Sequence, residues 1–148
     1  MEAQLDFKEL LELFNAHKVE YMIVGGYALA FHGAPRFTGD MDVYIKPSLE
    51  NAKRILLALN EFGFGSVGLR KEDFEHPDKV VQLGFPPVRI DIITSITGVS
   101  WEDAYHDCVT GKYGDITVQY IGLNDFIKNK RSMGRKKDQA DLEALGEE

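Results

Sequence analysis

The sequence predicts a single mixed α/β domain (α+β) built around a central β-sheet. Segments with helical periodicity alternate with short β-type runs, and a chain of 148 residues has the size of one ordinary domain. Hydrophobic residues make up 44% of the sequence, enough to bury a core without disulfides or structural metal. We therefore expect residues 1–148 to form one domain, with a sheet-containing core at about 20–121 and a helical part at 122–148.

The first half of the chain alternates helix and strand. Residues 6–17 place apolar side chains at positions i, i+3, i+4 and i+7, the spacing of a helix with one buried face. A β-type run at 19–24 stops at Gly25-Gly26, and a second at 40–45 stops before Pro47. The predicted order is helix 6–17, strand 19–24, helix 27–32, strand 40–45 and helix 48–62.

The second half of the chain is richer in strands. Two apolar runs flank Pro86-Pro87, and two more flank Gly114-Asp115, so each pair predicts a hairpin. A short helix or turn after Trp101 separates the hairpins, and two helices meeting at Gly134 end the chain. The predicted order is strands 79–85 and 88–94, strands 108–113 and 116–120, and helices 123–133 and 136–145.

The sequence is acidic except for one basic segment. The formal net charge is −7, but residues 128–137 contain six Lys or Arg and no acid. The rest of the sequence contains the other 11 bases and all 24 acids, so its formal net charge is −13. A basic patch on an acidic protein favours a local anion site over a general nucleic-acid surface.

Cysteine content and the N-terminus exclude several classes. Cys108 is the single cysteine, so no intramolecular disulfide can form, and we expect a buried core thiol. Without a Cys/His cluster there are no ligands for structural zinc, and no nucleophile elbow supports hydrolase chemistry. The acidic, interrupted N-terminus is typical neither of a signal peptide nor of a membrane span, so we expect a cytoplasmic protein.

Three acids suggest a metal site. Asp40 and Asp42 are two residues apart in a predicted strand, so both side chains point to one face, about 6.5–7 Å apart. Asp91 interrupts the apolar strand VRIDIIT, an unfavourable position unless the acid has a function. If the two strands are neighbours, the acids form a cluster that suits Mg²⁺. The alternatives are a solvated edge strand and, for Asp91, an ion pair with Arg89.

Residues 23–45, IVGGYALAFHGAPRFTGDMDVYI, resemble the nucleotidyltransferase superfamily that includes polymerase β. The signature of that family is a hydrophobic–Gly–Gly/Ser turn, a spacer, an Asp-x-Asp/Glu strand and a later acid on a neighbouring strand. Many members have Ser where this sequence has Gly26. Arg36, Thr38 and the tail GRKKDQADLEAL are similar to the small bacterial branch related to AbiEii/AbiGii-type domains. The resemblance extends over about residues 21–145.

The resemblance implies a nucleotidyltransferase-type sheet and transfer of a nucleoside monophosphate from an NTP to a hydroxyl. Asp40 and Asp42 then hold the Mg²⁺ (or Mn²⁺) that neutralises the triphosphate. Asp91 binds a second metal and helps to deprotonate the attacking hydroxyl. Gly25 and Gly26 hold the phosphates through backbone N–H groups. The base, the acceptor (protein, RNA or small molecule) and the oligomeric state do not follow from the sequence.

The resemblance also places the C-terminal helices near the triphosphate. It implies that three bases of the basic segment bind phosphate: Lys130, Arg135 and Lys137. The other three are expected on a solvated helix face: Lys128, Arg131 and Lys136. Asp138 and Asp141 are expected to cap a helix or to pair with nearby bases. Arg36 and Thr38 either contact the phosphate or acceptor, or belong to a loop without such a role.

Two rival functions stay open. One is a non-catalytic nucleotide- or partner-binding module, such as one component of a toxin–antitoxin pair. The other is a phosphatase or nuclease that uses the same acids and hydrolyses its substrate without an acceptor.

Overall fold

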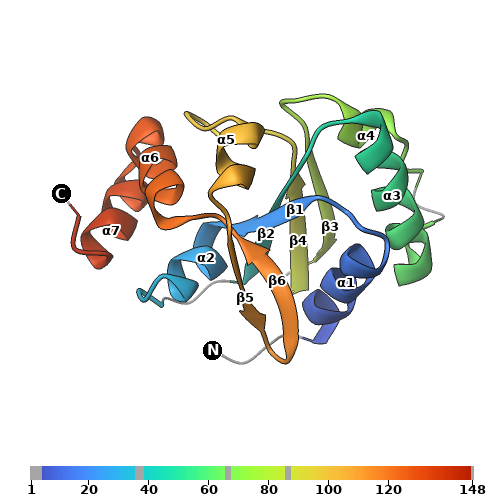
Figure 1. Ribbon diagram of the computed structural model, residues 1–148, viewed down its shortest axis with the longest axis horizontal. Coiled ribbons are helices and arrows are strands. Elements are labelled where there is room, and N and C mark those ends of the chain that lie inside the picture. The colour runs from blue at the N-terminus through green and yellow to red at the C-terminus, as the bar shows by residue number, and fades with distance from the viewer. Residues whose placement is uncertain (1–4, 36–38, 66–67, 86–87, 148) are drawn as a thin grey trace.

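A six-stranded mixed sheet lies at the centre of the fold (Figure 1). The computed structural model describes residues 5–35, 39–65, 68–85 and 88–147. The strands are β1 (Tyr21–Val24), β2 (Asp40–Ile45), β3 (Val80–Phe85), β4 (Val88–Ile93), β5 (Val109–Tyr113) and β6 (Ile116–Tyr120). The helices are α1 (Leu5–Ala16), α2 (Gly25–Phe31), α3 (Leu49–Leu59), α4 (Glu72–Glu75), α5 (Trp101–His106), α6 (Leu123–Met133) and α7 (Lys136–Ala144).

The strand order across the sheet is β3-β4-β2-β1-β6-β5. The two predicted hairpins, β3–β4 and β5–β6, form the two edges of the sheet and are antiparallel. Between them, β2 is antiparallel to β1 and parallel to β4, and β1 is parallel to β6. The sequence-adjacent strands therefore make the edges, whereas the centre brings together segments that are distant in the chain.

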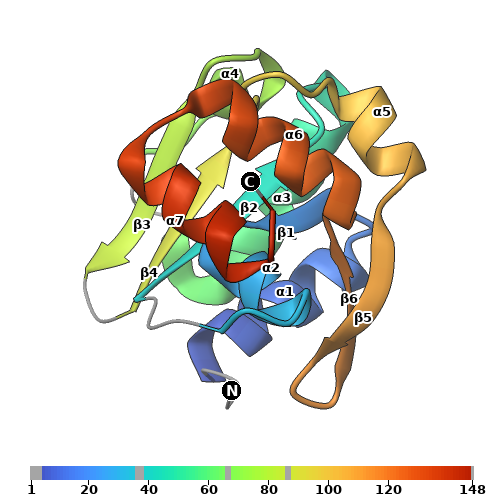
Figure 2. The ribbon, with the colours of Figure 1, turned by 90° about the vertical axis from the view of Figure 1, so that its left-hand side faces the viewer.

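Helices cover both faces of the sheet. In Figure 1, α1 and α3 lie on one side of the strands and α6 and α7 on the other. Figure 2, turned by 90°, shows α6 and α7 in front of the sheet, with α1 behind it. No helix in the described ranges is both long and apolar enough to cross a membrane.

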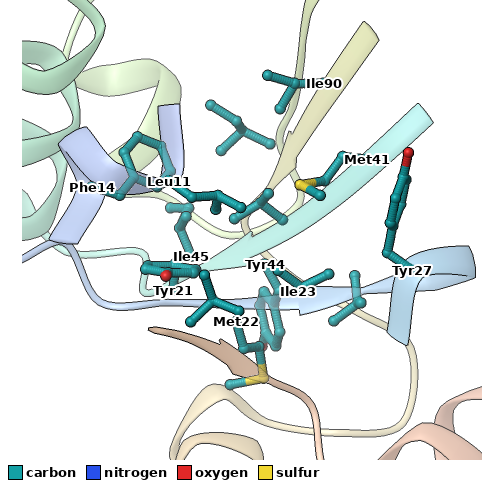
Figure 3. Packing of buried hydrophobic residues seen from close by; sticks show 14 of the residues in the cluster. Leu11, Phe14, Tyr21, Met22, Ile23, Tyr27, Met41, Tyr44, Ile45 and Ile90 are labelled. Atoms are coloured by element: carbon teal, nitrogen blue, oxygen red, sulfur yellow. The ribbon is translucent and has the colours of Figure 1, made fainter. Parts of the chain in front are cut away.

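Side chains along β2 point alternately into the core and to the opposite face of the sheet. Met41, Val43 and Ile45 are at most 1% exposed. Figure 3 shows Ile45 close to Leu11 and Phe14 of α1. Their burial removes several large apolar side chains from water, which is the main force that stabilises this layer. The intervening residues of β2 project from the opposite face.

The predicted fold class is confirmed, and so are the strand and helix positions to within two residues, except for the end of the helix predicted at 48–62. Three details are wrong. The helix after the glycine pair begins at Gly25 itself, and the predicted helix 48–62 ends at Leu59 in a π-helical segment, Asn60–Phe64, where Gly63 has φ 108°. The short helix α4 has no counterpart among the predictions. Cys108 is half-buried at the margin of the core, because it ends the loop before an edge strand.

Candidate active site

Asp40, Asp42 and Asp91 come together at one end of the central strands. Because β2 and β4 are parallel neighbours, Asp42 stands opposite Asp91 and Asp40 stands opposite Arg89. Neighbouring strands lie about 4.8 Å apart, so these side chains share one face of the sheet. Met41 and Ile90, the residues between them, are 1% and 3% exposed on the core face. The adjacency on which the predicted three-acid cluster depended is therefore present.

Arg89 connects two of the three acids. Its Nη2 atom lies 2.7 Å from Oδ2 of Asp40, and its Nε atom lies 3.1 Å from Oδ1 of Asp91. A second hydrogen bond, from Nη2 to Oδ2 of Asp91 at 3.1 Å, makes the Asp91 pair bidentate. A planar guanidinium suits this geometry because it donates two parallel hydrogen bonds to one carboxylate. The ion pair between Arg89 and Asp91 was expected as an alternative; its extension to Asp40 was not.

Asp42 is the electrostatically strained member of the cluster. Its pKa is raised to about 6: burial is the largest cause, the negative charges of Asp91 and Asp40 add to it, and Lys137 and Lys130 act in the opposite direction. Since desolvation and like charges both penalise the ionised form, the carboxylate has a strong tendency to attract a cation. Lys137 supplies the larger of the two favourable charges.

The donor set fits a hard divalent cation. Three carboxylates on one sheet face provide oxygen ligands of the type that Mg²⁺ prefers. In the described ranges no three acidic, His or Cys side chains are already arranged around a common point as metal ligands. Arg89 is instead the cation that binds Asp40 and Asp91. A metal would have to replace at least part of these ion pairs.

Gly25 sits directly against the cluster. It begins α2 with φ 68°, a left-handed conformation that favours glycine, and β1 pairs Val24 with Asp42 immediately before it. A Cβ atom built on Gly25 would collide with the Asp42 carboxylate. Val24, at the N-cap position, has no polar side chain to accept hydrogen bonds from the first N–H groups of the helix. Backbone at Gly25 and Gly26 can therefore approach a ligand closely.

Replacing Gly25 by alanine should damage the site and lower stability together. The new methyl group would push the Asp42 carboxylate away, and the left-handed backbone would cost about 1 kcal/mol more than with glycine. Urea unfolding and a nucleotide-binding titration should both report a loss. Gly146→Ala is the matched control, because Gly146 has φ 81° and no atom lies within 4 Å of the position that its new methyl group would take. Equal nucleotide binding by both variants would contradict the proposed role of the Gly25 backbone.

A cavity of about 520 Å³ opens over these residues. Gly25, Gly26, Asp40 and Asp42 line one end of it, whereas Asp91 is beside Asp42 but does not line it. Side chains of α6 and α7 form another wall, in agreement with the position of these helices in front of the sheet in Figure 2. The cavity is large enough for a small-molecule ligand of nucleotide size.

The three predicted phosphate ligands all line this cavity, but two of them form ion pairs with acids of the protein. Lys130 is 5% exposed, and its Nζ lies 3.3 Å from an oxygen of each of two buried acids, Asp138 and Asp141. Arg135 binds Asp138 through Nε at 2.7 Å and Nη2 at 3.1 Å. Lys137 makes no ion pair within the described residues and is exposed. The prediction that Asp138 and Asp141 pair with nearby bases is confirmed.

Two predicted site residues have no described position, and two residues that line the cavity were not predicted. Arg36 and Thr38 lie outside the described residues. Asp78 and Ser95 line the cavity but were absent from the prediction, because they follow from which loops meet in space. The signal for them in the sequence is weak: one polar residue precedes the first strand of the β3–β4 hairpin and the other follows its second strand.

Comparison with known proteins supports the fold. No model of a known protein family matches this sequence, and no curated protein matches it. A solved structure from Thermotoga maritima, assigned to the nucleotidyltransferases, has a TM-score of 0.64 at 16% identity, over 93% of this chain and 88% of that one.

Two further solved structures have the same architecture. The lincosamide antibiotic adenylyltransferase LnuA, solved with lincomycin bound, has a TM-score of 0.57 at 13% identity, over 98% of this chain and 97% of that one. An antigenic nucleotidyltransferase-like protein of Paracoccidioides brasiliensis also has a TM-score of 0.57, at 18% identity, over 97% of this chain and 75% of that one. At these identities the likeness establishes the architecture and leaves the reaction open. The protein has the mixed α/β fold of the nucleotidyltransferases.

Proposed function

We propose that this protein is a metal-dependent nucleotidyltransferase that moves a nucleoside monophosphate from an NTP to a hydroxyl of an acceptor. The observation that supports this most is the position of Asp40, Asp42 and Asp91 on one sheet face, beside a cavity whose opposite wall contains Lys137. Carboxylates for a cation and a lysine for phosphate are the two groups that such a transfer needs. Membership of the AbiEii/AbiGii-related branch is part of the same hypothesis.

Asp40, Asp42 and Asp91 would hold Mg²⁺ or Mn²⁺. When bound, the metal neutralises phosphate charge and makes the α-phosphorus more susceptible to attack. Arg89 balances the charge of Asp40 and Asp91 when no metal is present, which keeps the acids oriented.

The chain's own groups would handle binding and proton transfer. Backbone N–H groups of Gly25 and Gly26 and the ammonium of Lys137 would bind triphosphate oxygens. Asp91 would accept the proton of the acceptor hydroxyl. That oxygen then forms a bond to the α-phosphorus, the bond between this phosphorus and the β-phosphate bridging oxygen breaks, and pyrophosphate leaves.

Transfer can be tested directly with labelled nucleotides. The purified protein, Mg²⁺ and α-labelled ATP, CTP, GTP or UTP are incubated with cell lysate, and label should appear on an acceptor together with released pyrophosphate. Nucleotide binding that stabilises the protein without turnover would favour the non-catalytic module instead. Release of hydrolysed nucleotide without labelled acceptor would favour a phosphatase or nuclease.

Lys137→Met should weaken NTP binding markedly and lower stability only slightly, because the fold loses one exposed favourable charge near Asp42. Lys137 is exposed, lines the cavity and supplies the larger favourable charge to Asp42, so its loss should raise the dissociation constant about tenfold. Lys136→Met is the matched control, since Lys136 is also exposed and lies outside the cavity wall. Calorimetric titration with each NTP and Mg²⁺ measures the difference. Equal weakening by both variants would mean that only net charge matters.

A further inference from the structure

The cavity has a second polar end, away from the carboxylate cluster. Asp78, Ser95, Thr97 and Asn129 line it, and they come from the segment before β3, the loop after β4 and helix α6. Strand β4 connects the two ends, because Asp91 lies opposite Asp42 and Ser95 follows four residues later. Four residues of extended chain reach at most about 14 Å, a length comparable to the span from the phosphates to the base of a nucleotide.

Asp78 is exposed and is oriented by hydrogen bonds to Ser95. It adopts φ 63°, which is uncommon for a residue other than glycine. Its backbone N donates to Ser95 Oγ at 3.0 Å, and Ser95 Oγ donates back to Asp78 Oδ1 at 2.8 Å. The next residue is fixed as well, because Lys79 N donates to the buried Thr94 Oγ1 at 2.8 Å. A carboxylate fixed in this way loses little freedom when it binds a ligand.

The Asp78 carboxylate and the Asn129 side-chain oxygen offer acceptors at this end. Asp78 retains acceptor capacity on both carboxylate oxygens, since an ionised carboxylate has about four acceptor sites and one is used by Ser95. Asn129 uses its amide NH₂ to donate to the Thr97 carbonyl at 2.8 Å, which directs its own oxygen elsewhere as an acceptor. A ligand group that contacts the Asp78 carboxylate must therefore donate hydrogen bonds.

The cavity also has an apolar part to its wall. Ile93, Ile96 and Met133 contribute to it. Ile93 and Ile96 come from β4 and the loop after it, and Met133 from the end of α6. Such a lining suits the faces of a flat heteroaromatic ring, because the ring can lie against aliphatic and thioether groups.

We propose that Asp78 reads the edge of the nucleobase and makes the site selective for guanine. Guanine is the common base that offers two adjacent N–H donors, N1–H and the 2-amino group, to one carboxylate. Adenine and cytosine each place a ring-nitrogen acceptor beside their amino group, and uracil flanks its single N–H with two carbonyls, so each brings a lone pair against Asp78. This inference rests on the proposed function for the position of the triphosphate, and it adds the identity of the nucleotide.

The test is a binding titration with non-hydrolysable α,β-methylene triphosphates and Mg²⁺. The guanosine analogue should bind about tenfold or more tightly than the adenosine and uridine analogues, the discrimination typical of a bidentate base contact. The inosine analogue, which lacks only the 2-amino group, should fall between them. Asp78→Asn should remove the preference, Ser95→Ala should reduce it, and Glu72→Gln, an exposed acid of α4 outside the cavity wall, should leave it unchanged.

Each outcome separates this inference from the proposed function. Equal affinity for all four bases, or a guanine preference that persists in Asp78→Asn, overturns the role of Asp78 while NTP binding stands. No binding of any analogue overturns the proposed function itself. If Asp78→Asn leaves every affinity unchanged but slows transfer, Asp78 contacts the acceptor and the assignment to the base is wrong. The inosine comparison uses the unmodified protein, so it holds even if a variant fails to fold.

Discussion

Asp42→Asn is expected to abolish nucleotidyl transfer and, at neutral pH, to make the protein more stable. The amide keeps the shape of the side chain but loses the charge that would bind the metal. Metal stabilisation of a transition state is worth several kcal/mol, so the rate should fall about a hundredfold or more. If Asp42→Asn labels an acceptor as well as the parent protein, the proposed mechanism is wrong.

The gain in stability follows from the pKa of Asp42. Its value rises from 3.8 to about 6 on folding, so the folded state favours the protonated form. The stabilisation that this provides is complete below about pH 4 and is lost as the pH rises through about 6. At about pH 7.5 the ionised Asp42 therefore destabilises the parent by about 3 kcal/mol, a cost that the neutral amide lacks.

Urea unfolding in EDTA at about pH 4 and about pH 7.5 measures this effect. The variant should exceed the parent at the higher pH and match it at the lower pH, where Asp42 is already protonated, so the acidic measurement serves as the control. A variant that is less stable than the parent at both pH values would show that Asp42 makes a favourable contact instead. Added Mg²⁺ should stabilise the parent and leave the variant nearly unchanged.

Lys130→Met is expected to cause a larger loss of stability than removal of any exposed lysine. Lys130 is 6% exposed in its side chain, and its two partners, Asp138 and Asp141, are 0% and 4% exposed. Removing the lysine takes away the cation that two buried carboxylates share, and breaking a buried ion pair in this way typically costs about 3–5 kcal/mol.

Two variants make this expectation specific. Lys128→Met removes an exposed lysine from the same helix and should change the unfolding free energy by less than about 0.5 kcal/mol. Lys130→Met combined with Asp141→Leu removes both charges and should recover a large part of the loss. Urea midpoints provide the comparison. If Lys130→Met costs no more than Lys128→Met, the buried ion pairs contribute nothing to the packing of α6 against α7.

The sequence by itself determined the local structure and part of the site. Helical spacing located α1, α3 and the C-terminal helices, and β-type runs located the strands, because periods of 3.6 and 2 are properties of the chain. The same period of 2 placed Asp40 and Asp42 on one face. The glycine pair marked the junction of strand and helix, although only the structure shows that Gly25 has no room for a side chain beside Asp42.

Tertiary structure decided which distant groups meet. Asp91 joins Asp42 because β2 and β4 pair in parallel, a choice that local patterns do not encode. Lys130 and Lys137 look alike in the sequence, and both line the cavity, but the structure buries the first beside two acids and leaves the second exposed. Asp78 and Ser95 likewise meet only through the β3–β4 register. Strand pairing and side-chain burial depend on contacts between distant residues, whereas periodicity depends on neighbours in the chain. The sequence therefore predicted the elements, and the tertiary structure decided which of their side chains meet.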